Sequence, residues 1–535
     1  MNPQELLKFC LENGILLDAE VLNLFSEVTD SESAKLIISK IKNSTQERII
    51  TKSIFEKNKE QVSEFFLNLP RESQKNLEKL KIKLGLSIEI SREKVEPLIQ
   101  SKEIQKEEMK TETIPFQKEE ISAVKIASID SFPTRKLEVA DFVTYFRNRF
   151  SEMRDVLQSH SQLDNLVSIN KISGNNKKIS LIGMISDRKV TKNKNILLEI
   201  EDLTGKIKIM VSKNKSEVYE KAEEATLDSV LGFRCSGNKE IVFVEDIIFP
   251  DSALPERKKS PVEECALFIG DLHIGSKLFL EKNFLKFVDY LNGKIPNTPE
   301  SEKIKYLFVV GDIVSGVGNY PNQERDLEIK DLEEQFLKAA ELFGKIRSDI
   351  KIIISPGNHD GVRLMEPQPL LDEKYAWPLY NMKNVILTTN PCYVTVGAKK
   401  NFSGFEILSY HGFSYFYYAN NIPHLIKGKS KHSPNTIMKY LLKNRHFAPT
   451  HSSTQYFPSE KDSLMIRTIP DIFVSGHLHK SDVSYYNNIL MISTSSWESM
   501  TSNMEKFGAI PDFCKVPMFN LKTRQIKILD FEDEK

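Results

Sequence analysis

Three stretches in the middle of the chain decide its fold: CALFIGDLHIG at 265–275, KYLFVVGD at 305–312 and KIIISPGNHD at 351–360. Each contains an apolar run of strand length, followed by a glycine and a polar side chain of the kind that binds metals or substrates. Stretches with the helical spacing of apolar residues, 278–291 and 327–347, lie between them. This alternation predicts a layered α/β architecture, in which functional side chains gather at the carboxyl ends of the strands.

Two later runs repeat the pattern, FEILSYHG at 405–412 and DIFVSGHLH at 471–479. The five strand ends together supply carboxylate, amide and imidazole side chains but no thiolate, a set that suits Mn, Fe or Zn. These side chains are Asp271, His273, Asp312, Asn358, His359, His411, His477 and His479. One Asp or His after a strand is usually structural. Five such strand ends in one region favour a metal centre.

Phosphate ester hydrolysis explains why so many ligands are present. The oxygens of the substrate repel a nucleophile, so two metal ions are used to activate water and to neutralise the phosphoryl oxygens. We expect Asp312 to bridge the two ions, and we expect Asp271 and His273 to reach one ion from the same strand end. We expect His359 to protonate the leaving alkoxide, with Asp360 orienting its ring.

We expect the α/β region that carries the candidate ligands to span residues 262–535. The rest of the chain divides into three parts. Residues 1–70 have the spacing of a small helical domain. Residues 71–150 are rich in Lys and Glu, which predicts a charged, partly flexible linker. Short β-rich runs between polar turns in 160–252 predict a five-stranded barrel, with the OB-fold as the leading candidate.

Composition narrows the class of protein. The 535 residues include 74 basic and 74 acidic side chains, so any nucleic-acid surface has to be local. No apolar run approaches the ~18–20 residues of a membrane span. The N-terminus carries Glu5 and Glu12 and does not resemble a signal peptide, which predicts a cytoplasmic protein. Five scattered cysteines argue against disulfides and structural zinc.

A basic and aromatic stretch surrounds His411. Between 407 and 459 the chain has no Asp or Glu. Single-stranded nucleic acid favours such a surface, because phosphates pair with Lys and Arg while bases stack on aromatic rings. The alternative is a buried aromatic cluster beside a solvated loop. The candidate DNA contacts are Lys427, Lys429, Lys431 and Arg445, and the aromatic candidates are Tyr410, Phe413, Tyr415, Phe416, Tyr417 and Tyr418.

The order D-x-H, GD, GNHD, H and GH-x-H resembles that of the calcineurin-like metallophosphoesterases, whose α/β fold layers β-sheets between helices. Five segments resemble the small subunits of archaeal family D DNA polymerases, over about residues 160–530: IGDLHIGSKLFLEKNF, VVGDIVSGVGNYPNQE, ISPGNHDGVRLMEPQP, LLKNRHFAP and VSGHLHK. This resemblance implies a proofreading 3′-5′ exonuclease, usually supported by manganese. It also implies a separate large subunit that polymerises DNA.

The resemblance further implies how the ligands are shared. The first metal ion would take Asp271, His273 and His479, the second would take Asn358, His411 and His477, and both would share Asp312, with His359 as the acid. One departure is Ser315, where the GD-x-x-D run of the family has an acidic residue. We expect this departure to affect local hydrogen bonding more than activity.

Three functions remain open at this stage. The first is an active nuclease subunit with two divalent ions, Mn before Fe, Zn or Mg, acting on single-stranded DNA or a primer 3′ end beside a large catalytic subunit. The second is a scaffold, like the related eukaryotic subunits that have lost their metal ligands. The third is a stand-alone phosphatase or cyclic-nucleotide phosphodiesterase. The full ligand set argues against a scaffold, and the barrel and basic stretch argue against a stand-alone enzyme.

Overall fold

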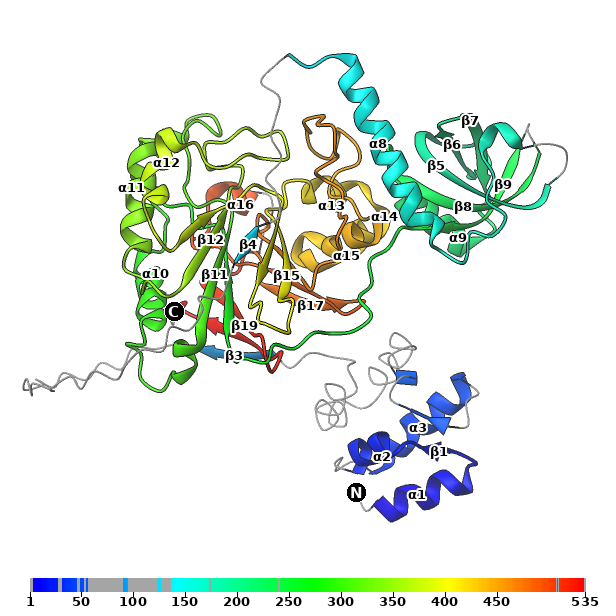
Figure 1. The fold of residues 1–535 in the computed structure, drawn as a ribbon, viewed down its shortest axis with the longest axis horizontal. Helices are drawn as coiled ribbons and strands as arrows, with labels where there is room; N and C mark the ends of the chain where they lie inside the picture. Colours follow the sequence, from blue (N-terminus) through cyan, green and yellow to red (C-terminus); the bar gives the residue numbers. More distant parts are fainter. Residues whose placement is uncertain are drawn as a thin grey trace, which may run out of the picture. The chain divides into compact units, whose positions relative to one another are not determined.

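Figure 1 shows the computed structural model of the chain, which divides into two compact units, Met1–Ser91 and Arg92–Lys535. The structure describes residues 3–26, 31–45, 49–51, 54–55, 90–94, 124–126, 136–172, 176–238, 241–506, 508 and 510–533. Among these residues, no helix combines the length and the apolar character that a membrane span requires.

The first unit is small and mainly helical. Its described elements are α1 (Pro3–Glu12), β1 (Leu16–Leu17), α2 (Ala19–Ser26), α3 (Ser31–Thr45) and β2 (Ile49–Ile50). The strands pair in parallel, and one apolar cluster that includes Leu6, Phe25 and Ile38 forms the core. These elements lie within 1–70, the range predicted to be helical. In the predicted linker, 71–150, most residues lie outside the described part of the chain.

Residues 176–248 of the second unit form a closed barrel of five strands, as the sequence predicted. The strands follow the order β5-β6-β7-β9-β8, and α9 (Ser216–Glu224) connects β7 to β8. Along β6, Ile196, Leu198 and Ile200 are buried while the residues between them are half-exposed, as a strand with one face toward a core requires. The bounds are β5 (Asn176–Val190), β6 (Ile196–Asp202), β7 (Gly205–Val211), β8 (Val230–Gly237) and β9 (Val242–Ile248).

Two mixed sheets form the larger part of the unit. The seven-stranded sheet has the order β13-β12-β11-β10-β19-β20-β3, and the six-stranded sheet has the order β17-β18-β16-β15-β14-β4. The rings of Phe405 on β15 and Phe519 on β19 lie 5.6 Å apart between centroids, so the sheets pack face to face. The bounds are β3 (Ile90–Lys94), β4 (Lys125–Ile126), β10 (Cys265–Ile269), β11 (Ile304–Val310), β12 (Lys351–Ser355), β13 (Val385–Leu387), β14 (Cys392–Val396), β15 (Phe405–Tyr410), β16 (Ile472–Ser475), β17 (Asp482–Tyr486), β18 (Ile489–Ser493), β19 (Lys515–Asn520) and β20 (Ile526–Asp530).

Helices cover the outer faces of both sheets, which confirms the layered arrangement predicted from the sequence. The helices α10 (Glu281–Leu291), α11 (Leu332–Phe343) and α12 (Glu373–Tyr380) share an apolar core with β10, β11 and β12. On the six-stranded sheet, the core is shared by α8 (Val139–Gln158), α13 (Tyr415–Asn421), α14 (Pro423–Lys427) and α15 (Pro434–Asn444). A short helix, α16 (Ser502–Lys506), follows β18.

Helix α8 begins inside the range predicted as linker and joins the barrel to the sandwich. Its Arg149 is buried and forms an ion pair with Asp462, which is also buried. The same guanidinium donates to the carbonyl of Pro449 at 2.7 Å and to that of Asp228, beside the barrel strand β8, at 3.4 Å. The Tyr145 hydroxyl, one helical turn away, also donates to Asp462. One buried cation therefore connects three parts of the unit.

Candidate metal centre

All seven predicted metal ligands follow shortly after strands of the sandwich. They are Asp271 and His273 after β10, Asp312 after β11, Asn358 after β12, His411 after β15, and His477 and His479 after β16. Strands β10, β11 and β12 run parallel in one sheet, and β15 and β16 run parallel in the other. The site therefore forms where the carboxyl ends of these parallel strands, from both sheets, meet.

Five of these residues have a left-handed backbone conformation that non-glycine residues rarely adopt. Their φ angles lie between 51° and 70°, for Asp271, His273, Asp312, His477 and His479. This conformation costs about 1–3 kcal/mol per residue and persists only where the surrounding structure imposes it. Because such strain clusters at functional sites, the backbone gives an indication of function independent of the side chains.

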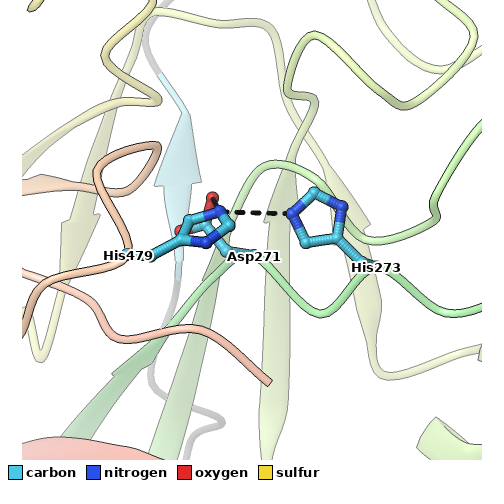
Figure 2. Close-up of side chains that lie close together, drawn as sticks. All are labelled: Asp271, His273 and His479. Carbon is cyan, nitrogen blue, oxygen red and sulfur yellow. Dashed lines mark hydrogen bonds and ion pairs between the residues drawn. The ribbon is translucent and has the colours of Figure 1, made fainter. Parts of the chain in front are cut away.

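The first cluster contains Asp271, His273 and His479, which Figure 2 shows with both imidazole rings turned toward one another. The Nε2 atoms of His273 and His479 lie 3.3 Å apart, and the His479 Nε2 lies 3.3 Å from a carboxylate oxygen of Asp271. Burial lowers the pKa of His273 well below its usual value, and the charge of His359 adds to that effect. Neutral imidazole is the form that binds a metal.

The second cluster contains Asp312, His411 and His477. The His411 Nε2 lies 3.2 Å from Asp312 Oδ2 and 3.1 Å from Asn358 Oδ1. The His411 Nδ1–H donates to the carbonyl of Val310 at 2.9 Å, which fixes the ring so that Nε2 faces the cluster. The Nε2 of His477 is buried and has no hydrogen-bond partner within the described chain. A metal ion would satisfy that atom.

Asp312 lies between the two clusters. The same oxygen, Oδ2, is 3.2 Å from Nε2 of His411 and 4.0 Å from Nε2 of His273, while Oδ1 accepts the backbone N–H of His359 at 2.8 Å. Burial opposes ionisation of Asp312, but the charges of His411 and His359 outweigh it and hold its pKa well below its usual value. The lowered pKa favours the charged form of Asp312, and its place between the clusters is the one that a bridging ligand would need.

Gly357 shows how closely the backbone approaches this carboxylate. A Cβ atom at that position would lie 2.2 Å from Asp312 Oδ1, which no side chain can tolerate. The glycine in GNHD is therefore required for the contact between the β12 strand end and Asp312.

The prediction that Asp360 orients the His359 ring is wrong. Both oxygens of the Asp360 carboxylate accept backbone N–H groups, from Val314 at 3.0 Å and from Gly357 at 2.7 Å. The His359 Nδ1–H instead donates to the backbone carbonyl of Ser315 at 2.9 Å. Asp360 therefore holds the two strand-end loops together. Because the contact at 315 uses the main chain, a serine there leaves it intact.

Two residues of the site could not be found from the sequence. The Asn319 amide nitrogen lies 3.1 Å from His359 Nδ1 and donates to the Ser315 carbonyl at 3.0 Å. Glu498 is buried, and burial raises its pKa while the charges of His479 and His359 oppose that rise. Neither residue belongs to a strand-end motif, so no local signal marked it.

The predicted DNA contacts differ in their exposure to solvent. Lys427, Lys429 and Lys431 are exposed. The prediction for Arg445 is wrong, because its guanidinium is buried and donates to the backbone carbonyls of Ile466 and Arg467.

The aromatic residues around His411 also differ in how far they are buried. Tyr410, Tyr415 and Tyr418 are fully buried in the core beneath α13, so base stacking on them is excluded and the alternative of a buried cluster holds. Phe416 differs, since 46% of its surface is exposed.

Comparison with known proteins identifies the family. The family of DNA polymerase alpha/epsilon B subunits matches residues 266–483. The chain is 34% identical to the DNA polymerase II small subunit of Methanothermobacter thermautotrophicus, covering 74% of this chain and 80% of the relative. It is also 34% identical to that of Pyrococcus furiosus, covering 74% of this chain but only 64% of the relative. A solved structure titled as a novel archaeal phosphodiesterase covers 49% of this chain and 98% of its own, with 12% identity and a TM-score of 0.26, values too low to support an inference. By its identity to polymerase subunits along most of their length, this chain belongs to the family of DNA polymerase II small subunits.

Proposed function

We propose that this chain is the small subunit of a two-subunit DNA polymerase and that it hydrolyses DNA phosphodiester bonds from the 3′ end with two metal ions. The observation that supports this most directly is the pair of ligand clusters on either side of Asp312 Oδ2. A scaffold subunit has no need of a complete ligand set. A strained backbone around a buried, ionised carboxylate would be costly to keep without a function.

The ligands fit two divalent ions. We assign the first ion to Asp271, His273, His479 and Asp312, and the second to Asp312, Asn358, His411 and His477. The unpartnered, buried Nε2 of His477 supports this assignment, as does the Val310 carbonyl that directs Nε2 of His411 into the site. Oxygen and imidazole ligands without thiolate favour Mn, with Fe, Zn or Mg as alternatives.

The chain's own residues supply the proton transfer. When bound, the two ions would activate water and neutralise the phosphoryl oxygens. The bond from His359 Nδ1–H to the Ser315 carbonyl holds the ring and leaves Nε2 as the atom that gives a proton to the leaving 3′ oxygen. Asn319, at 3.1 Å from Nδ1, restricts the ring further.

The barrel supports DNA as the substrate. Its order, with a helix between the third and fourth strands, is that expected of an OB-fold, a barrel that often binds single strands. The exposed Lys427, Lys429 and Lys431 are the basic residues that we propose to contact the phosphate backbone. The large polymerising subunit is the proposed partner.

The direct test uses purified chain, Mn²⁺ and a single-stranded oligonucleotide labelled at its 5′ end. We expect a ladder of products that shorten from the 3′ end, and we expect the large polymerase subunit to co-purify with the chain from its source. An intact oligonucleotide would favour the scaffold alternative. Equal turnover of p-nitrophenyl phosphate and DNA ends would favour a stand-alone phosphoesterase.

Metal binding gives a prediction that does not depend on activity. We expect two Mn²⁺ ions per chain in equilibrium dialysis, and a rise in melting temperature when Mn²⁺ is added to metal-free protein, because ligands that bind the native state stabilise it. Asp271→Asn should reduce the number of bound ions, since it removes a carboxylate from the first cluster only. Asp349→Asn, on an exposed carboxylate paired with Lys305, is the control. Unchanged stoichiometry in Asp271→Asn would contradict the assignment.

His359→Ala tests the general acid. We expect kcat to fall about 10²- to 10⁴-fold, which is the usual contribution of acid–base catalysis, while KM for DNA changes little. Steady-state kinetics on the labelled oligonucleotide measures both constants. Mn²⁺ stoichiometry should remain at two, because His359 is in neither ligand set. A change in KM alone would show that His359 binds substrate and does not donate a proton.

A further inference from the structure

Phe416 is an exposed aromatic ring in contact with a proposed metal ligand. Its ring lies 5.2 Å from that of His477 between centroids, at an interplanar angle of 76°. The two rings are therefore nearly perpendicular, and 46% of the surface of Phe416 is open to solvent. Burying a phenylalanine stabilises a protein by about 1.5–3 kcal/mol, so this position gives up part of that stabilisation.

The surroundings of Phe416 show that the exposure is specific to this position. Its neighbours on α13, Tyr415 and Tyr418, are fully buried in the core. Phe413, which precedes the helix, is half-buried, and its ring lies 5.8 Å from that of His477. The helix thus anchors one face in the core and presents Phe416 on the other, beside the metal centre. A single exposed phenylalanine is ordinary. One whose ring centroid lies 5.2 Å from that of a proposed metal ligand is within reach of a bound substrate.

The helices that follow Phe416 pack against the barrel. On α14, the His424 Nδ1 lies 3.7 Å from a carboxylate oxygen of Glu224, at the end of α9. On α15, the Tyr440 hydroxyl donates to the backbone carbonyl of the same residue at 2.7 Å. The helical segment that begins with Phe416 is therefore connected directly to the barrel.

We propose that Phe416 stacks on the base of the 3′-terminal nucleotide and so holds the scissile phosphodiester at the metal centre. The proposal rests on the proposed nuclease function. A base and its own 5′ phosphate are adjoining parts of one nucleotide, so a ring beside His477 is in the right place for the base when the phosphate is at the ligands. Aromatic rings bind any base in this way, because every base has a π-face.

The test compares two 5′-labelled single strands in the full chain with Mn²⁺, one with a normal terminal base and one with an abasic 3′-terminal residue. We expect wild type to remove the normal residue roughly 5- to 100-fold faster, as the contribution of one stacked base implies. Phe416→Ala should lower the rate on the normal end by a similar factor and lose the discrimination. Phe416→Trp should keep it. Trp377→Ala, on a 41% exposed aromatic residue of α12, is the matched control and should behave as wild type.

Each outcome has a distinct meaning. Discrimination that persists in Phe416→Ala would overturn the role of Phe416 while leaving the nuclease function intact. Wild-type protein that leaves both strands uncut would overturn the proposed function itself. Melting temperatures measure whether each variant is folded, and we expect little change for Phe416→Ala because the ring is exposed.

Discussion

Asp312→Asn is expected to reduce DNA hydrolysis by on the order of 10³-fold or more. The shared carboxylate oxygen faces both ligand clusters, at 3.2 Å from His411 Nε2 and 4.0 Å from His273 Nε2. An amide of the same size removes the negative charge that would hold two cations near each other. Metal ions contribute several kcal/mol to phosphoryl transfer, and each 1.36 kcal/mol corresponds to a factor of ten in rate. The release of nucleotides from a 3′-labelled single strand with Mn²⁺ measures the effect.

Asparagine is chosen because it preserves the contacts that alanine would remove. The side-chain oxygen of asparagine can still accept the His359 backbone N–H that Asp312 Oδ1 accepts at 2.8 Å. The fold should therefore persist, which a melting curve checks. Asp349→Asn is again the control for loss of a single carboxylate. Full activity of Asp312→Asn would refute the two-metal assignment.

Arg149→Met is expected to lower the free energy of unfolding by about 3–5 kcal/mol, the usual cost of breaking a buried ion pair. The guanidinium and the Asp462 carboxylate are both almost completely buried, so the variant removes the cationic partner of a buried carboxylate and leaves it with Tyr145 and His446. It also removes the bonds to the carbonyls of Pro449 and Asp228. Urea unfolding followed by tryptophan fluorescence measures the change, since Trp497 is buried in the sandwich.

A matched control is available on the same helix. Arg147 is exposed on α8, so Arg147→Met should change stability by less than about 0.5 kcal/mol. Equal effects at 147 and 149 would show that the ion pair is not what stabilises α8 against the rest of the unit.

The effect at Arg149 should depend on pH. Burial opposes ionisation of Asp462, but the charges of Arg149 and His446 outweigh it and hold its pKa well below the usual 3.8. A carboxyl with a lowered pKa in the folded state contributes stability above its unfolded pKa, and that stability is lost as the pH falls toward the folded pKa. The difference between wild type and Arg149→Met should therefore be largest above about pH 5 and shrink below about pH 4.

Each candidate metal ligand could be picked out from the sequence because it belongs to a local pattern, and the structure brings these side chains together. Asp312 or His477 follows an apolar run of strand length and a glycine, and parallel strands bring their carboxyl ends together whatever the rest of the chain does. The same reasoning predicted the five-stranded barrel, since the short β-rich runs and the polar turns between them are local patterns.

Predictions that depended on burial were less successful. Six aromatic residues around His411 have similar composition and spacing, yet Tyr410 is fully buried and Phe416 is not. Arg445 is a basic residue in an acid-free stretch, but backbone carbonyls from residues 466 and 467 surround its guanidinium. Residues far along the chain decide such burial, and sequence spacing carries no information about them.

Features that depend on neighbouring residues can be predicted from the sequence, whereas features that depend on residues far apart in the chain require the tertiary structure. The sequence by itself indicated the strands that carry the candidate ligands and the side chains that stand at their ends, but it did not indicate β13, β14, β17, β19 or β20. Only the tertiary structure decided that Asp312 faces both clusters, that the Ser315 carbonyl and not Asp360 holds His359, and that Arg149 pairs with a carboxylate 313 residues away. The first group depends on propensities and periodicity over a few residues. The second depends on which hydrogen bonds and charges remain satisfied once distant segments exclude water from between them.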